Sequence, residues 1–126
     1  MNGFLKMIQV ISYPVSNWQA SKKFYGETLG LPLALAMEEG GWIEYGDKDQ
    51  VHLAIMRPQD GSPVPPHQGG AIAVFMVEDA HAAVKELRRR GVKCDDAIPI
   101  PGMITFANFY DPDGYTLQVA GPPPQG

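Results

Sequence analysis

The feature that most constrains the fold is a strand–turn–strand segment that occurs twice in the chain. The later copy spans residues 106–120 and has Asp-Pro-Asp-Gly at 111–114 between two apolar stretches, a combination typical of a tight turn. The earlier copy spans residues 42–56 and aligns with it at a constant spacing that pairs Asp47 with Asp111. A hairpin is therefore predicted in each half of the chain.

The segments ahead of the two hairpins repeat as well. Residues 8–17 and residues 70–79 are each an apolar stretch followed by a helical pattern. We therefore predict two tandem modules of about sixty residues, longer than the usual helical solenoid repeats. The predicted boundaries are module 1 at about 5–56, a linker at 57–69, module 2 at about 70–120 and a flexible tail at 121–126.

Each module is predicted to have the order β-α-β-β-β, which makes the fold class α+β. Ser16 with Gln19 resembles a capping box before a helix that Gly30 ends, and Asp79 is the predicted cap of a helix reaching about Arg90. The predicted strands are 7–13, 33–37, 41–45 and 51–56 in module 1, and 71–77, 92–97, 103–110 and the closing strand in module 2. We expect the two modules to form a curved mixed sheet around a shared cavity.

Composition and charge limit the classes of function. The chain has 126 residues, 44% hydrophobic and 19% charged, which suits one globular domain. A net charge of −4 and a pI near 5.2 argue against nucleic-acid binding, which needs a basic face. No apolar run is long enough to span a bilayer and no signal-peptide pattern is present, so we expect no membrane contact and a cytoplasmic location. Cys94 is the only cysteine and is expected to be a buried, inert thiol.

Three short motifs carry a resemblance to a known family. They are Phe24-Tyr25 with Leu29-Gly30-Leu31, Val77-Glu78-Asp79 before the second helix, and the Asp-Pro-Asp-Gly turn at 111–114. In this order and spacing the chain resembles the vicinal oxygen chelate superfamily of glyoxalases, bleomycin resistance proteins and extradiol dioxygenases. The resemblance covers nearly the whole chain and implies a small-molecule ligand and a homodimer.

The resemblance also implies positions for a divalent metal, with His and Glu ligands on the first and last strand of each module. These positions fall on Val10, Ala54, Ile72 and Gln118. Only Gln118 offers an oxygen, and one neutral amide does not supply the several His or carboxylate donors that a divalent ion needs. We therefore expect neither a metal nor another cofactor.

Because strand side chains alternate, residues two apart from those positions are predicted to share the cavity face. The predicted ligand-binding residues on this face are Val10, Ser12, His52, Ala54, Ile72, Val74 and Gln118, with Ile8, Met56, Thr116 and Ala120 beside them. Trp42, Phe106 and Asn108 are further predicted ligand-binding residues, and the pattern leaves open which face they and Glu44 occupy. A mostly apolar wall with a few polar groups is typical of small-molecule sites. The alternative is that these residues only fill the space between the modules.

His52 and Glu44 are the weak candidates for catalysis. His52 either acts as a base or ligand, or forms a structural hydrogen bond to Gln118 or a backbone carbonyl. Glu44 is either a buried acid or, the interpretation we favour, an exposed charge on its strand.

Three functions fit these observations. The first is a metal-free protein that sequesters a small apolar or aromatic molecule, with Trp42 and Phe106 as stacking surfaces. The alternative is a divalent-metal-dependent lyase, isomerase or dioxygenase in which His52, Glu44 and Gln118 form an atypical site. The third is an interaction module whose cavity is vestigial.

Overall fold

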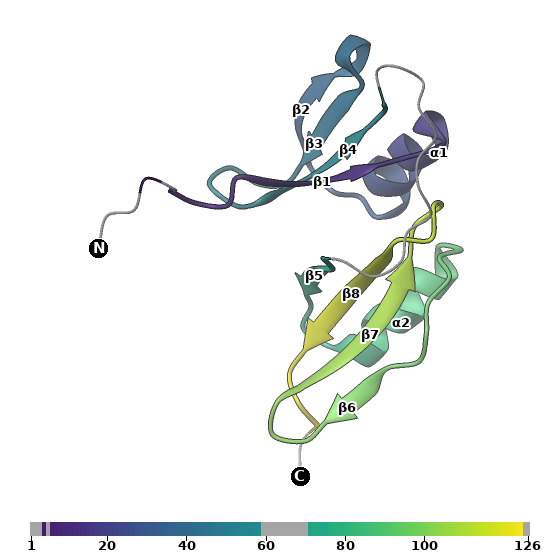
Figure 1. Cartoon of the computed structure of the whole chain (residues 1–126). Coiled ribbons are helices and arrows are strands. Elements are labelled where there is room, and N and C mark those ends of the chain that lie inside the picture. Colours follow the sequence, from purple (N-terminus) through teal and green to yellow (C-terminus); the bar gives the residue numbers. More distant parts are fainter. Residues whose placement is uncertain (1–3, 5, 59–70, 125–126) are drawn as a thin grey trace. The chain divides into compact units, whose positions relative to one another are not determined.

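The computed structural model of the chain describes residues 4, 6–58 and 71–124. The chain divides into two compact units, Met1–Pro65 (unit 1) and Pro66–Gly126 (unit 2). Each unit has one four-stranded mixed sheet with helix beside it (Figure 1). The fold class is therefore α+β with two tandem βαβββ modules, as predicted. Most of the predicted linker, from residue 59, lies outside the described residues, and a shared cavity stays a prediction.

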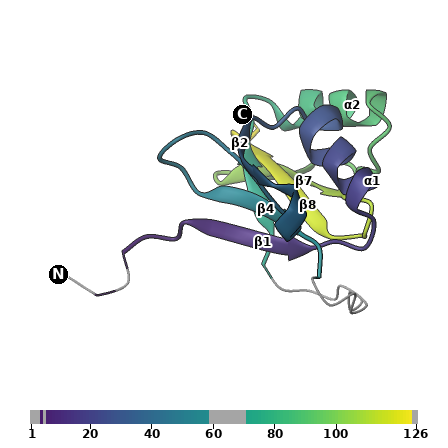
Figure 2. The same cartoon turned by 90° about the horizontal axis from the view of Figure 1, so that it is seen from above.

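Unit 1 has the strand order β1-β4-β3-β2. Its strands are β1 (Val10–Pro14), β2 (Leu33–Met37), β3 (Trp42–Tyr45) and β4 (His52–Met56). Strand β1 runs parallel to β4 at one edge (Figure 2), and the other two pairings are antiparallel. The first strand is shorter than predicted: its ladder begins at Val10, and Met7 and Ile8 are exposed. A short 3-10 turn, η2 (Glu38–Gly40), joins β2 to β3.

The helix of unit 1 consists of α1 (Trp18–Lys22) and a π-helical continuation, η1 (Lys23–Thr28). The predicted cap at Ser16 is wrong by one residue. The side chain of Asn17, in extended backbone, accepts from the Ala20 N–H at 3.0 Å. Asn is as good a cap as Ser and here stands directly before the first helical residue, so it satisfies an N–H that the helix leaves free.

The core of unit 1 lies between this helix and one face of the sheet. Tyr25 is fully buried and stacks on Tyr45 of β3, with 6.1 Å between ring centroids. Phe24 meets the Tyr25 ring edge-on at 5.0 Å. These contacts identify the face of β3 that carries Tyr45 as the helix side, so the side chains of the alternate residues point the other way.

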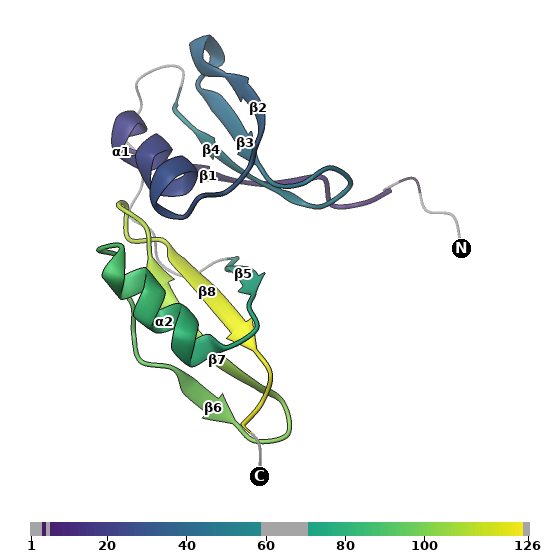
Figure 3. The ribbon, with the colours of Figure 1, turned by 180° about the vertical axis from the view of Figure 1, so that it is seen from behind.

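Unit 2 has the strand order β5-β8-β7-β6. Its elements are β5 (Ala73–Met76), α2 (Ala80–Arg89), β6 (Ile98–Ile100), β7 (Ile104–Tyr110) and β8 (Thr116–Gly121). Helix α2 lies across β7 and β8 (Figure 3). Asp79 caps it as predicted, accepting from the N–H groups of His81 and Ala82 at 2.9 and 3.2 Å. Val84 and Leu87 of the helix are buried.

The predicted turn at 111–114 joins β7 to β8. Asp111 is 5% exposed, and its Oδ1 accepts from the N–H groups of Asp113 and Tyr115 at 2.9 and 2.8 Å. The N–H of Gly114 donates to the Asp111 carbonyl at 2.9 Å, with a φ of +87° that favours glycine. One carboxylate therefore organises the turn that holds these two strands in register.

The strand predicted at 92–97 is wrong. In this segment only Cys94 forms a bridge, with Phe109, and the edge strand is β6, beginning at Ile98. Two backbone bonds to β7 flank this bridge: the Asp95 N–H donates to the Asn108 carbonyl at 2.8 Å and the Tyr110 N–H donates to the Lys93 carbonyl at 3.1 Å. Side chains add to them, since Arg88 donates to the Cys94 carbonyl at 2.9 Å and the Tyr110 hydroxyl donates to Asp95 at 2.5 Å. Among the described residues, no helix is long and apolar enough to cross a bilayer.

Candidate functional site

The face of each sheet opposite its own helix is called the open face here. In unit 1 the ladder places Ser12 and Glu44 on either side of Ala54, and pairs Trp42 with Met56. The predicted site residues of unit 1 that lie in its strands therefore share this face, away from Tyr45, whereas Ile8 precedes β1 and the ladder does not fix its direction. Those strand residues are Val10, Ser12, Trp42, Glu44, His52, Ala54 and Met56.

Three side chains on the open face of unit 1 form a hydrogen-bonded group, which we call the indole–carboxylate–imidazole cluster: Trp42, Glu44 and His52. The indole N–H of Trp42 donates to Oε2 of Glu44 at 2.8 Å. The other carboxylate oxygen, Oε1, lies 2.8 Å from Nδ1 of His52. The second ring nitrogen of His52 lies 3.0 Å from the carbonyl oxygen of Asp47. Both oxygens of Glu44 and both nitrogens of His52 thus have partners.

The electrostatics of the cluster follow from these contacts. The hydrogen bond from His52 lowers the pKa of Glu44 below 4.5, and the bond from Trp42 lowers it further. The contact with Glu44 raises the pKa of His52 above 6.5, helped by the Asp47 carbonyl. An imidazole that faces an acceptor at each nitrogen is fully satisfied only when both nitrogens carry protons. The geometry therefore favours an ion pair of imidazolium and carboxylate.

Two sequence-based interpretations are settled by the cluster. Glu44 is not an exposed strand charge: its side chain is 13% exposed, because Trp42 and His52 cover it. His52 does bond a backbone carbonyl, that of Asp47, but its side-chain partner is Glu44, and Gln118 instead donates to Asn108. A half-buried carboxylate is tolerated when it is paired in this way.

Gly46 makes room for the imidazole. Its φ is +139°, and a Cβ at this position would lie 2.8 Å from Cδ2 of His52. Real Cβ atoms do not approach this closely, so a larger residue would displace the ring. The turn glycine therefore belongs to the local structure that places His52 beside Glu44.

The open face of unit 2 carries the predicted residues of the second module. Val74 of β5 and Asn108 of β7 both pair with Gln118 of β8, and Phe106 pairs with Ala120. Leu117 and Val119, the alternate residues, are buried. The strand residues that share the open face are Val74, Met76, Ile98, Ile100, Ile104, Phe106, Asn108, Tyr110, Thr116, Gln118 and Ala120. Ile72 precedes β5, so the ladder does not fix its direction.

Polar groups on this second face are few and meet across β7 and β8. The amide nitrogen of Gln118 donates to the Asn108 carbonyl oxygen at 3.0 Å. Around this pair the surface is apolar and accessible, with Val74 54% and Ile98 49% exposed. The repeat places Asn108 where unit 1 has Glu44, and Phe106 where unit 1 has Trp42. Each unit thus has an aromatic residue and a hydrogen-bonded polar residue at the same two positions of its third strand.

The four positions that the resemblance assigns to metal ligands do not fit a divalent ion. Val10 and Ile72 are hydrocarbon, Ala54 is fully buried, and the Gln118 amide is bonded to Asn108. Within the described residues, no three His, Cys, Asp or Glu side chains gather where they could share a metal. Hard and borderline ions require several such donors.

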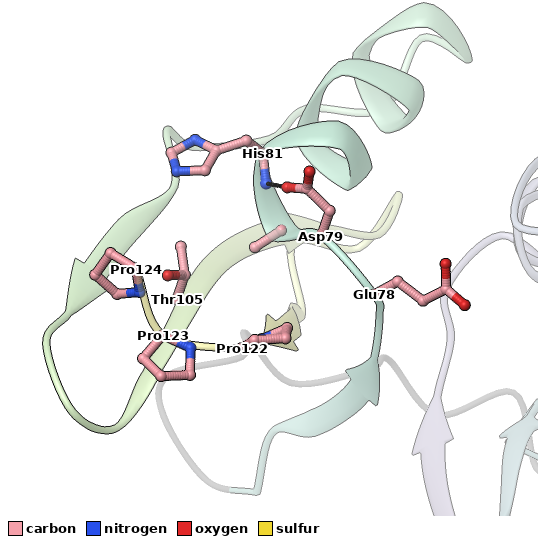
Figure 4. Close-up of a pocket in the computed structure, with 8 residues that line it drawn as sticks. Glu78, Asp79, His81, Thr105, Pro122, Pro123 and Pro124 are labelled. Atoms are coloured by element: carbon pink, nitrogen blue, oxygen red, sulfur yellow. Dashed lines mark hydrogen bonds between the residues drawn. The ribbon is translucent and has the colours of Figure 1, made fainter. Parts of the chain in front are cut away.

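Sequence reasoning missed a shallow pocket of about 250 Å³ in unit 2 (Figure 4). It lies at the start of α2 and is lined by Glu78, Asp79, Ala80, His81, Thr105, Pro122, Pro123 and Pro124. The Asp79 carboxylate points back to the helix and caps it, and His81 is exposed. Apolar periodicity gives no signal for such a pocket, since its rim is a run of prolines.

Cys94, the remaining reactive residue type, is half-buried. Burial raises the pKa of its thiol above 9.0, although Arg88 opposes this shift. A thiol with a raised pKa is a poor nucleophile. The prediction of an inert cysteine agrees with this environment.

Comparison with known proteins adds the family. The profile of the Glyoxalase/Bleomycin resistance protein/Dioxygenase superfamily matches residues 7–119. The structure of TnmS3, an antibiotic binding protein from Streptomyces sp. CB03234, is similar at 27% identity and a TM-score of 0.76, over 96% of this chain and 99% of that one. A glyoxalase-related enzyme from Fulvimarina pelagi is similar in fold at 23% identity and a TM-score of 0.73, over 97% and 94% of the two chains. A search of curated proteins gave no match.

Proposed function

The chain belongs to the Glyoxalase/Bleomycin resistance protein/Dioxygenase superfamily, and we propose that it binds a small apolar or aromatic molecule without a metal, as a sequestering protein of the resistance type. The observation that carries this proposal is the matching arrangement of the two open faces. Each has an aromatic residue beside a pair of hydrogen-bonded polar residues, with apolar side chains around them. Apolar walls with a few placed polar groups are how proteins bind small molecules.

The two aromatic residues suit an aromatic ligand. Trp42 and Phe106 are half-buried, so part of each ring is accessible to a ligand while the rest packs against the sheet. Offset stacking on such rings contributes about 0.5–1.5 kcal/mol beyond the area buried. The Asn108–Gln118 pair would orient the ligand, because the bond between them leaves the Asn108 amide N–H groups and the Gln118 carbonyl oxygen to face it.

The likeness to TnmS3 supports the same proposal. That protein is described as antibiotic binding, and the similarity extends over nearly the full length of both chains. Function does not follow from a shared fold, so the likeness raises the priority of antibiotics as probes and leaves the ligand to be identified by experiment.

One observation favours an enzyme as the second candidate. His52 and Glu44, a nitrogen donor and a carboxylate, lie 2.8 Å apart on one face, and a divalent-metal-dependent lyase, isomerase or dioxygenase would use both. Against this, each donor atom of the pair already has a hydrogen-bond partner. A metal would have to break these bonds, and it would need at least one more ligand.

The experiment is a thermal-shift screen of chelator-treated protein against aromatic antibiotics, α-ketoaldehyde–thiol adducts and catechols, each with and without Mn²⁺, Fe²⁺, Ni²⁺, Zn²⁺ or Co²⁺. A ligand at 100 times its Kd stabilises the native state by about 2.7 kcal/mol. Binding as proposed predicts stabilisation without metal, lost in Trp42→Ala and kept in Met103→Ala, whose parent side chain is 67% exposed. Stabilisation seen only with a metal would support the enzyme.

Two further proposals concern the setting of this site. We propose a homodimer, as the resemblance implies, and a cytoplasmic location consistent with a single cysteine. Analytical ultracentrifugation at micromolar concentration tests the first, and cell fractionation tests the second. A monomer at all concentrations would contradict the dimer.

A further inference from the structure

We infer that Glu44 is a positioning residue that fixes the indole of Trp42 on the open face of unit 1, with His52 holding Glu44 in place. The inference rests on the proposed function for the purpose of this arrangement, because the ring it fixes is the proposed stacking surface. The contacts themselves do not depend on that purpose. They form a sequence of restraints that runs from the β3–β4 loop to the indole.

The restraint on Trp42 comes from one directional bond. Trp42 and Glu44 are two residues apart on β3, so their side chains emerge from the same face. The indole N–H reaches Oε2 of Glu44 at 2.8 Å, which directs the ring along the strand toward Glu44. A half-buried indole without this bond would sample other rotamers, because only its N–H is polar.

The restraint on Glu44 comes from His52. A free glutamate side chain has considerable rotamer entropy, and a single bond to an indole would leave its carboxylate able to turn. Here the second oxygen is held at 2.8 Å by Nδ1 of His52, across the β3–β4 pair. Both oxygens of the carboxylate therefore have a hydrogen-bond partner, and because the side chain is 13% exposed, little water competes with these partners.

The restraint on His52 comes from the loop between the strands. Its Nε2 lies 3.0 Å from the Asp47 carbonyl, and its ring lies over Gly46, where no Cβ would fit. The neighbouring side chains on β1, Val10 and Ser12, are uncharged, so Glu44 is the charged group that faces the imidazole from the strands beside it. The imidazole ring is therefore restrained by the backbone of Gly46 and by an acceptor at each of its two nitrogens.

This arrangement also bears on the ligand. Glu44 uses both oxygens within the cluster, and His52 compensates its charge. The open face of unit 1 therefore presents an anchored aromatic ring rather than a free carboxylate. A neutral aromatic molecule is the class that such a surface accepts, whereas a cation would find its counter-charge already paired.

The test follows the indole N–H of Trp42 by NMR in the free, full-length protein. The chain has two tryptophans, so Trp42→Phe assigns the signals. Glu44→Ala is expected to move the Trp42 signal and to speed its exchange with water about tenfold, since a bond to a carboxylate typically contributes at least one factor of ten. Glu39→Gln, at an exposed residue nearby, is the control and should leave the signal unchanged.

Two variants separate positioning from mere packing. Glu44→Gln keeps an oxygen acceptor for Trp42 but loses the charge, so it should retain a hydrogen-bonded indole signal that moves less than in Glu44→Ala. His52→Ala should free one oxygen of Glu44 and move the same signal without changing Trp42 or Glu44. An indole signal that is the same in wild type and Glu44→Ala overturns the inference, provided that both spectra are dispersed and folded.

A second arm, a titration with 1-naphthol as a neutral aromatic probe, tests the proposed function separately. If 1-naphthol shifts the Trp42 signal of the wild type and binds Glu44→Ala roughly 2- to 12-fold more weakly, the cost of ordering one side chain, both proposals are supported. If it leaves the wild-type signal unchanged while Glu44→Ala still moves that signal, the positioning role stands and the stacking role is contradicted. If 1-naphthol binds wild type and Glu44→Ala equally and the Trp42 signal is the same in both proteins before it is added, the positioning role alone is contradicted.

Discussion

The turn at 111–114 allows a direct test of whether the Asp111 carboxylate keeps β7 and β8 in register. In Asp111→Ala the N–H groups of Asp113 and Tyr115 lose the carboxylate that accepts from both of them. Hydrogen bonds to charged groups contribute about 1.5–3 kcal/mol each, and a buried N–H left without an acceptor costs about 1–3 kcal/mol. The two bonds share one oxygen, and Asp113 is near enough to solvent for water to replace its partner. We therefore expect a loss of about 2–4 kcal/mol in the free energy of unfolding.

The repeat supplies the matched control, Asp47→Ala. Asp47 occupies the same place in the first hairpin, but it is exposed and contacts His52 through its backbone carbonyl, which alanine keeps. Its substitution should change stability by no more than about 0.5 kcal/mol. Asp111→Asn, which keeps an oxygen acceptor, should recover part of the loss.

Urea unfolding followed by circular dichroism measures both variants. With an m-value of about 2 kcal/mol per molar, Asp111→Ala should lower the midpoint by roughly 1–2 M. Both tryptophans lie in unit 1, so tryptophan fluorescence reports the unfolding of that unit. If the units unfold independently, Asp111→Ala should lower the midpoint seen by fluorescence less than the midpoint seen by circular dichroism. If the two alanine variants have the same midpoint, the carboxylate does not organise the turn and the reasoning is wrong.

Three further predictions concern pH, packing and metal. The ion pair of Glu44 and His52 should stabilise the fold most between pH 4.5 and 6.5. Its contribution is lost as pH falls through the lowered pKa of Glu44 and as pH rises through the raised pKa of His52. The free energies of unfolding of wild type and Glu44→Gln, measured in urea, should therefore differ most in that window. Leu117→Ala, at a fully buried position, should cost about 2–5 kcal/mol in the same assay. Val10→His combined with Ala54→Glu should create affinity for Zn²⁺ or Ni²⁺ measurable by calorimetry, and the absence of any heat would contradict the register by which we placed the ligand positions.

The parts of the fold predicted from the sequence are those with a local signal. The turn at 111–114 has residues whose backbone preferences allow few alternatives, and Asp79 stands directly before a helical pattern. The strand at 92–97 was predicted wrongly because the segment meets β7 at a single bridge and does not continue into a regular ladder, and side-chain bonds from Arg88 and Tyr110 supplement that bridge. The π-helical turn at Lys23–Thr28 gave no sequence signal that we identified.

The candidate site was predicted as a set of positions and not as a set of contacts. Alternation placed His52 on the cavity face, whereas the facing of Trp42 and Glu44 was left open and is given by the ladder between β3 and β4. Whether Glu44 reaches His52 depends on the register of the two strands, which the loop between them sets, and a slip of one residue would move one of the two to the opposite face. The pairing of Gln118 with Asn108 depends in the same way on the turn at 111–114.

The parallel pairing of β1 with β4 has a consequence for how the chain folds. Val10 pairs with His52, and in unit 2 Ala73 pairs with Leu117, so the first strand of each unit finds its partner only when the last strand is available. The β3–β4 and β7–β8 hairpins close over short loops, whereas the parallel pairings must close most of a unit and carry a larger loss of chain entropy. During synthesis Val10 leaves the ribosome before His52, so β1 cannot pair with β4 until β4 has been made. Strands β1 and β5 should then dock last and, as edge strands, exchange their amide hydrogens first.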